Sequence, residues 1–123
     1  MLPFVLQRHS TREGVHYDLM LDAGDGGRLP TWRLDALPST DGQPLAARRL
    51  ADHRRIYLTY EGPIGGDRGE VHIADAGSYE CEHRSADRWV IRLCGEALAG
   101  RFELRRDAAG GPGSWRMVAL PPG

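Results

Sequence analysis

Lysine is missing from this chain of 123 residues, in which all 16 basic side chains belong to arginine. Codon usage in a GC-rich genome is the simplest explanation, although arginine also suits planar, bidentate recognition of phosphate. The arginines are offset by 17 acidic residues, which leaves a formal net charge of −1. A nearly neutral chain lacks a strong overall attraction to phosphate, so charge alone does not indicate a nucleic-acid partner.

Cysteine is scarce as well: the chain has two, Cys81 and Cys94, and no C-x-x-C motif. This excludes a thioredoxin-like redox motif and a zinc ribbon. A zinc site made of both cysteines with His72 and His83 would match no familiar ligand spacing. We therefore expect two reduced thiols in a cytoplasmic protein.

Long apolar runs and nucleotide-binding loops are also absent. No run approaches the length of about 18 residues that a membrane-spanning helix needs, so we expect no membrane partner. The N-terminus lacks the features of a secretory signal peptide, which again predicts a cytoplasmic location. The glycine-rich stretch 62–69 fits neither the P-loop nor the dinucleotide-binding pattern, and no serine-nucleophile motif occurs. The length predicts one domain over residues 1–123, with a monomer as the default state.

The chain does have a clear hydrophobic period of two. In segment 15–22, the leucines point to one side while His16 and Asp18 point to the other. Similar patterns predict short strands at 3–8, 15–22, 29–34, 69–74, 78–83, 88–94, 100–106 and 114–119. Segment 38–50 is ambiguous, and a short helix starting near Leu45 is one interpretation. Many short strands separated by turns are typical of an all-β sandwich or barrel.

Turns at 85–87, 95–99 and 107–113 would bring the later strands into register. The expected pairs are Tyr79 with Leu93, Cys81 with Ile91, Leu93 with Phe102, Ile91 with Leu104, and Leu104 with Met117. One apolar face would then run through four strands of a meander. The same register places Cys94 opposite Ser78 rather than Cys81, which argues against a disulfide.

The polar side of segment 15–22 is the first candidate site. His16 and Asp18 project from the same face, about 6–7 Å apart along the strand. His9 precedes a turn-like stretch that would return the first strand beside this one. Two histidines and a carboxylate on adjoining strands could bind one divalent metal with coordination positions left open. The alternative is the ordinary polar face of a half-buried strand.

The second candidate is His53, which lies in the basic sequence RRLADHRRIY at 48–57. Histidine, arginine and the tyrosine hydroxyl can all donate hydrogen bonds to phosphate oxygens. The alternative here is a solvated loop.

Several short motifs follow one another along the chain. FVLQRH ends at His9, HYDL covers 16–19, and a tryptophan follows at Trp32. The stretch 52–64 has the pattern D-H-x-x-x-Y-x-x-Y-E-G-x-I. Later motifs are GEV at 69–71, DAGSY at 75–79, and LAGRFEL at 98–104 followed by Trp115. Together and in this order, these motifs resemble the 3′-phosphoesterase domain of bacterial DNA ligase D.

The resemblance implies a compact antiparallel β-barrel with a polar active-site crater. It implies Mn²⁺-dependent removal of 3′-phosphates and 3′-ribonucleotides from DNA or DNA–RNA primer ends, with other divalent metals as alternatives. Matched residue by residue, the metal ligands are His9, His16 and Asp18. Gln7 would support the metal ligands through a hydrogen bond, and Asp52 would be a second supporting residue.

The resemblance also implies the residues that handle the phosphate. His53 and Tyr57 would contact the scissile group and would act in catalysis together with His9. Arg48 and Arg49 lie close enough in sequence to join them as phosphate-binding residues. A protonated His53 would stabilise charge that develops in the transition state or would assist the leaving group.

The chain departs from the family in its cationic residues. Met20 stands where the family has an arginine two residues after the metal-binding aspartate, and the lysine-bearing P-K-G-P segment after the tryptophan is missing. Two alternatives to the DNA-end enzyme therefore stay open. One is a metal- and phosphate-binding module for nucleic-acid ends, and the other is a phosphodiesterase acting on a small phosphoester. An enzyme of DNA end repair would also need a separate ligase or polymerase as its partner.

Overall fold

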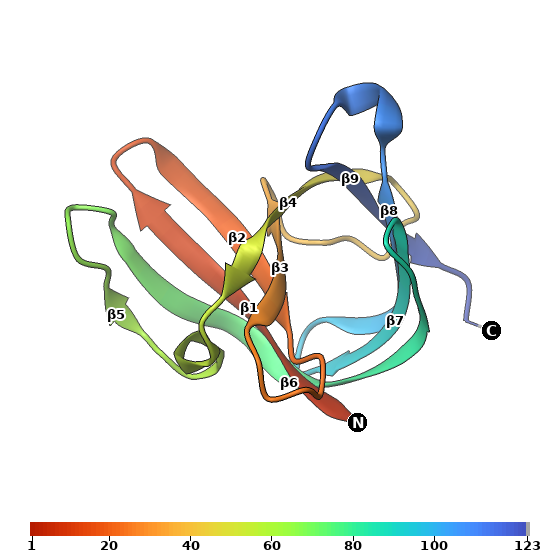
Figure 1. Ribbon diagram of the computed structural model, residues 1–123, viewed down its shortest axis with the longest axis horizontal. Coiled ribbons are helices and arrows are strands. Elements are labelled where there is room, and N and C mark those ends of the chain that lie inside the picture. The colour runs from red at the N-terminus through yellow and green to blue at the C-terminus, as the bar shows by residue number, and fades with distance from the viewer. Residues whose placement is uncertain (123) are drawn as a thin grey trace.

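The computed structural model describes residues 1–122, which are mostly β-strand (Figure 1). The strands are β1 (Leu2–Thr11), β2 (Gly14–Leu21), β3 (Leu29–Leu34), β4 (Leu45–His53), β5 (Gly62–Pro63), β6 (Glu70–Arg84), β7 (Arg88–Gly95), β8 (Ala99–Arg106) and β9 (Ser114–Leu120). Two short 3₁₀-helices, η1 (Arg55–Leu58) and η2 (Ala108–Gly110), interrupt them. Across residues 1–122, no helix has the length and apolar character needed to cross a membrane.

Eight of the strands close into an antiparallel barrel. Their order is β1-β2-β3-β4-β9-β8-β7-β6, and the ring closes because β1 also pairs with β6. The pairing of β1 with β6 shifts register between Leu6 and Gln7, which marks a β-bulge. The short β5 pairs with the start of β6. In Figure 1 the β1–β2 hairpin and the β5–β6 connection extend side by side to the left of the barrel. The all-β barrel expected from the sequence is confirmed.

The barrel interior is filled by alternate residues of the strands, as a period of two requires. Trp32 is completely buried and makes edge-to-face contacts with Trp89 and Trp115, at ring-centroid distances of 5.2 and 5.6 Å. Such contacts between aromatic rings add to the free energy gained from burying their area. A smaller apolar cluster of Val5, Met20 and Leu29 lies apart from this core.

Most of the expected registers are confirmed. Tyr79 faces Leu93, Cys81 faces Ile91, Leu104 faces Met117, and Cys94 faces Ser78. Both cysteines are free thiols.

The predicted register of β7 with β8 was wrong by two residues. In the structure Phe102 faces Ile91 and Leu104 faces Trp89. The connecting turn is tighter than expected, since Gly95 N–H donates to the Leu98 carbonyl at 2.9 Å. A shift of two residues preserves alternation, so the same side chains still point into the barrel.

One segment assignment was wrong as well, and the ambiguous segment 38–50 proves to contain the start of a strand. Segments 69–74 and 78–83 form one continuous strand, β6, because Gly77 does not turn the chain. A side chain there would place its Cβ 2.2 Å from the Cys94 carbonyl oxygen, so glycine permits a close approach of two strands. Leu45 begins β4 rather than a helix, because the segment pairs with β9 and buries Ala47.

Asp75 shapes the β7–β8 turn from the neighbouring strand β6. Its buried carboxylate accepts hydrogen bonds from the backbone N–H groups of Ala76, Glu96, Ala97 and Leu98, at 2.8, 3.0, 3.1 and 2.6 Å. Burial alone would raise the pKa of Asp75, but the four N–H donors outweigh it and lower the pKa below its ordinary value of 3.8.

We expect Asp75→Ala to lower the free energy of unfolding by roughly 2–3 kcal/mol, because buried N–H groups lose their acceptor. Urea denaturation at neutral pH measures this. Asp41→Ala is the matched control, since Asp41 is exposed and accepts one backbone N–H from Gln43. A loss no greater than that of the control would show that Asp75 does not hold the turn.

The pH dependence of this contribution follows from the lowered pKa. The stabilisation is complete above the unfolded pKa of 3.8 and is lost as pH falls through the lower pKa of the folded state. Between pH 5 and about pH 2, wild type should therefore lose more unfolding free energy than Asp75→Ala. Parallel acid titration curves for the two proteins would contradict this.

Candidate metal centre and phosphate cavity

The three residues expected to bind metal lie on adjoining strands, on the face turned away from the barrel core. His9 of β1 is directly opposite His16 of β2, and Asp18 is two positions further along β2. Leu19 and Leu21 belong to the core cluster. Because a strand alternates its side chains, His16 and Asp18 must project from the opposite face.

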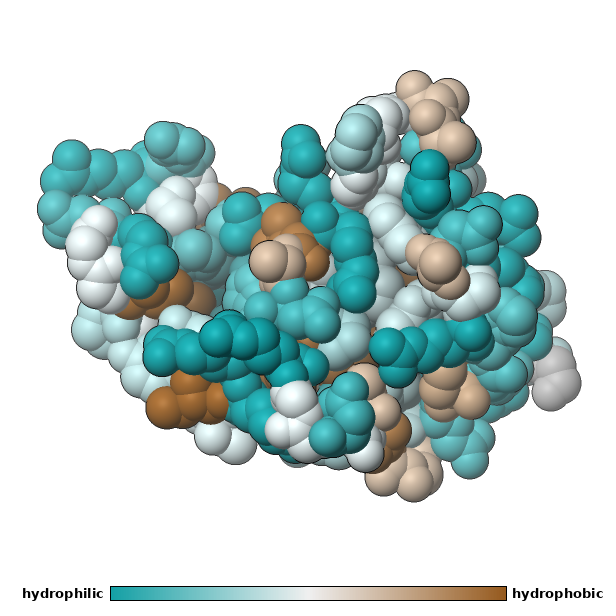
Figure 2. Space-filling view, in the orientation of Figure 1, coloured by the Kyte–Doolittle hydropathy of each residue, from teal (hydrophilic) through white to brown (hydrophobic). Residues whose placement is uncertain are grey.

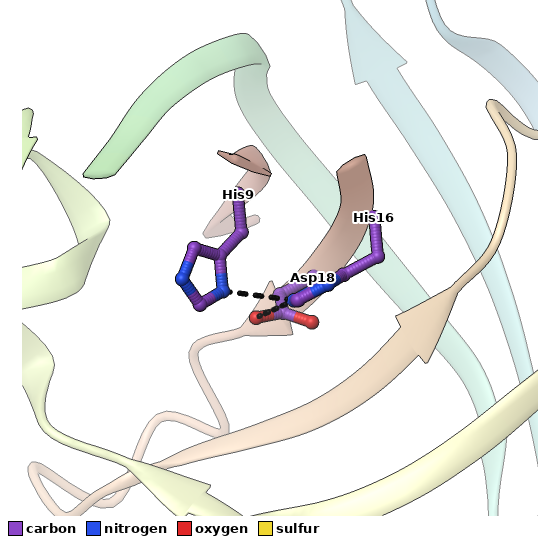
Figure 3. Close-up of side chains that lie close together, drawn as sticks. All are labelled: His9, His16 and Asp18. Atoms are coloured by element: carbon purple, nitrogen blue, oxygen red, sulfur yellow. Dashed lines mark hydrogen bonds and ion pairs between the residues drawn. The ribbon is translucent and has the colours of Figure 1, made fainter. Parts of the chain in front are cut away.

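The three side chains converge, as Figure 3 shows. His9 Nδ1 lies 2.8 Å from His16 Nε2, and His16 Nε2 lies 3.7 Å from Asp18 Oδ2. One ligand atom from each residue falls within 4.8 Å of the others, and residues 1–122 contain no second group of this kind. The structure thus brings together the residues that the sequence placed in one metal site.

The protonation of the two rings suits coordination. His9 Nε2 lies 2.7 Å from the Arg68 carbonyl oxygen, which can only accept, so Nε2 carries the proton and Nδ1 presents a lone pair to His16. Burial lowers the pKa of His16, although Asp18 opposes this shift. A neutral His16 can bind a metal, and one cation could replace the proton shared by the two rings. Two imidazoles and one carboxylate are a donor set that fits a first-row divalent metal.

Asp18 is held in place by an arginine from β3. The carboxylate is 2% exposed and therefore needs partners. Arg33, directly opposite Asp18, donates from Nε to Oδ1 at 3.1 Å and from Nη2 to Oδ2 at 3.5 Å. Oδ2 is also the oxygen that faces His16. Arg33 thus orients the carboxylate toward the histidines.

His9, His16 and Asp18, which we call the metal group, border a cavity of about 1010 Å³. Its lining carries five arginines and five acidic residues: Arg12, Arg28, Arg33, Arg54 and Arg68, and Glu13, Asp18, Asp35, Asp52 and Asp67. The lining is therefore formally balanced, and a divalent cation bound by the histidines and Asp18 would make it attractive to an anionic ligand. The face drawn in Figure 2 is mostly hydrophilic, with several separate hydrophobic patches.

His53 and Tyr57 line the same cavity. His53 is the last residue of β4 rather than part of a loop, and it is half-buried. Its Nδ1 donates to the Ala51 carbonyl oxygen at 2.9 Å, so Nε2 is the ring nitrogen left for a ligand. The Tyr57 ring lies edge-on to it at 6.0 Å. The two residues are therefore positioned to contact the same bound group.

Gln7 connects the metal strand to η1. It is buried, and its Nε2 donates to the carbonyl oxygens of Tyr57 and Tyr60 at 3.1 and 3.3 Å. These hydrogen bonds fix the η1 backbone, and with it Tyr57, relative to His9 on the same strand as Gln7.

Three other candidates differ in their placement. Asp52 lines the cavity and pairs with Arg49 Nη2 at 3.3 Å. The Arg49 guanidinium stacks on Trp32 at 4.5 Å from the ring centroid, outside the cavity, and burial lowers its pKa. Arg48 lies outside the cavity too, in a neighbouring hollow that it shares with Arg33.

The sequence interpretation included Arg54 in the basic stretch 48–57 but missed Arg12, Arg28, Arg33 and Arg68 of the cavity lining. For Arg33 a signal was present: segment 29–34 was expected to be a strand, and Trp32 reads as a core residue, so Arg33 had to face the other way. For Arg28 and Arg68 there was no such signal, because they lie at strand ends or in loops whose path is set by tertiary contacts.

The all-β barrel holds a histidine–carboxylate group beside an open polar cavity, and its match to a known protein family supports a phosphoesterase-like function for it. The family described as the DNA ligase D 3′-phosphoesterase domain matches residues 7–106, and the chain belongs to this family. A comparison with curated proteins finds no match.

We expect His9→Ala to abolish binding of Mn²⁺ while leaving the barrel folded, because His9 is a partly exposed residue outside the core. Isothermal titration with Mn²⁺ measures binding, and thermal unfolding measures the fold. His72→Ala is the matched control, since His72 is an exposed histidine on β6. Unchanged affinity in His9→Ala would exclude it as a ligand.

Met20 is fully buried against Val5 and Leu29, under Tyr57 and Leu58. Met20→Arg should therefore destabilise the protein by on the order of 3 kcal/mol, since it buries a charge in an apolar cluster. Met20→Leu keeps the volume and should cost less than about 1.5 kcal/mol. Equal denaturant midpoints for Met20→Arg and wild type would show that the cluster is open to water.

Proposed function

We propose that this chain is a Mn²⁺-dependent phosphoesterase that removes a 3′-phosphate or 3′-ribonucleotide from DNA primer ends, in DNA end joining. The proposal is carried by one observation: His9, His16 and Asp18 bring their ligand atoms within 4.8 Å of one another beside a polar cavity that His53 and Tyr57 also line. Membership of the 3′-phosphoesterase family supports a phosphate ester as the bond that is hydrolysed. The healed end would pass to a separate ligase or polymerase.

The metal side of the reaction rests on His9, His16 and Asp18. Nitrogen and carboxylate ligands suit Mn²⁺ among several divalent ions. When bound there, such a cation supplies charge neutralisation at the phosphate and a more acidic water molecule. The carboxylate is kept in position by Arg33, and the tautomer of His9 is set by the Arg68 carbonyl oxygen.

The phosphate side rests on His53 and Tyr57, which line the same cavity. When both of its ring nitrogens are protonated, His53 can donate the Nε2 proton to the leaving oxygen, and the Tyr57 hydroxyl can bind a non-bridging oxygen. The guanidinium groups of Arg33 and Arg54 neutralise charge on the bound phosphate. Gln7 keeps η1, and therefore Tyr57, at a constant distance from the metal ligands.

The test uses a 5′-labelled primer–template that ends in a 3′-phosphate or a 3′-ribonucleotide, with Mn²⁺ or with chelator. We expect Mn²⁺-dependent dephosphorylation or shortening, lost in His9→Ala and reduced on the order of 10²-fold in His53→Ala. His83→Ala is the matched control, because His83 is an exposed histidine on β6 outside the cavity.

Two outcomes would contradict the proposal. A Mn²⁺-dependent mobility shift of the labelled DNA without product would indicate a binding module for nucleic-acid ends. Neither product nor shift, combined with turnover of small phosphodiesters, would indicate a different substrate.

A further inference from the structure

A row of polar residues leads away from the metal group across the outer face of the barrel. Gln7, Asp18, Arg33, Arg48 and Ser114 are successive cross-strand partners on β1, β2, β3, β4 and β9. Directly opposed residues of antiparallel strands project from the same face. Neighbouring strands lie about 4.8 Å apart, so Arg48 starts about 10 Å from Asp18.

Arg33 and Arg48 are like charges placed directly opposite each other, which is an unfavourable arrangement in a sheet. Asp18 offsets the charge of Arg33. The exposed Arg48 side chain makes no hydrogen bond or ion pair in residues 1–122, and the one acidic residue that lines its hollow, Asp35, is exposed and does not pair with it. Arg48 is therefore an unpaired guanidinium opposite Arg33, and an anion bound between the two guanidinium groups would relieve their repulsion.

There is space for such an anion. Arg33, Asp35 and Arg48 line a hollow of about 260 Å³ together with Gly113 and Ser114. Arg33 and Asp35 also line the main cavity, so the two spaces adjoin. Gly113 has no side chain to fill the hollow beside Arg48; a Cβ there would lie 3.8 Å from Arg48 Nη1. The Ser114 hydroxyl adds a neutral hydrogen-bond donor.

We infer that Arg33 and Arg48 bind the phosphodiester group that precedes the 3′-terminal phosphate of a nucleic-acid strand. This inference rests on the proposed function, because it takes the metal group as the place of the terminal phosphate. Arginine forms paired hydrogen bonds with phosphate oxygens. Two guanidinium groups therefore suit the singly charged phosphodiester, which is bound but not cleaved. The row then makes the protein prefer the end of a polynucleotide over a nucleotide that has no preceding phosphodiester.

The test compares two probes, a nucleoside 3′-monophosphate and a 3′-phosphorylated dinucleotide. Their affinities are measured by competition with labelled DNA in chelator, and their kcat/KM values are measured with Mn²⁺. We expect wild type to prefer the dinucleotide, and Arg48→Gln to reduce that preference about tenfold. Arg33→Gln should weaken both probes, since Arg33 borders both spaces.

Arg92→Gln is the matched control, because it removes the same charge from β7, on the opposite side of the barrel. It should leave the preference unchanged. On a longer 3′-phosphorylated single strand, Arg48→Gln should also reduce the slope of log affinity against log salt by about 0.7, the value for one phosphate contact. A preference and salt slope equal to those of wild type would overturn the inference.

The two proposals fail in different ways. If wild type converts both probes and Arg48→Gln changes neither the preference nor the salt slope, the inference is wrong and the proposed function stands. If wild type converts neither probe, yet binds the dinucleotide more tightly in a manner that Arg48→Gln removes, the proposed function is wrong and the phosphodiester site stands.

Discussion

The register between β1 and β2 is the constraint on which the site depends. Because His9 lies opposite His16, and because strands alternate their side chains, the two rings meet on the outer face while Leu19 enters the core. A slip of one residue would send the histidines inward and the leucines outward. A slipped register would expose the apolar core face, which is energetically unfavourable. Core packing therefore also keeps His9, His16 and Asp18 in their relative positions.

Charged residues on the outer face of the barrel fall into two groups, those paired with a buried carboxylate and those exposed to solvent. Asp18 is buried and needs partners, and Arg33 supplies one from the next strand. This ion pair directs one carboxylate oxygen toward the histidines. The remaining arginines around the cavity are exposed or partly exposed, so the free energy they lose in desolvation is small and their charge is available to a ligand. The same lining also carries five acidic residues, so these arginines are available as single hydrogen-bond donors to phosphate and do not form a net positive surface.

Met20, at the position where the resemblance implies an arginine, lies in an apolar contact in this structure. Met20 packs with Val5 and Leu29 beneath η1, which carries Tyr57. The helix is thereby supported by apolar contacts from below and by the hydrogen bonds of Gln7 from the side. On the neighbouring strand, Arg33 supplies a cation on the same face, and its guanidinium pairs with Asp18.

The amino-acid sequence by itself determined the strands with strict alternation, the all-β class, and the gathering of His9, His16 and Asp18, because these depend on a period of two and on a short hairpin. Only the tertiary structure decided the rest. The β7–β8 turn follows Asp75 from a different strand, β4 forms by pairing with β9, and the arginines of the cavity come from five separate segments. Contacts between residues distant in the chain leave little local pattern, since their free energy depends on closure of the whole barrel.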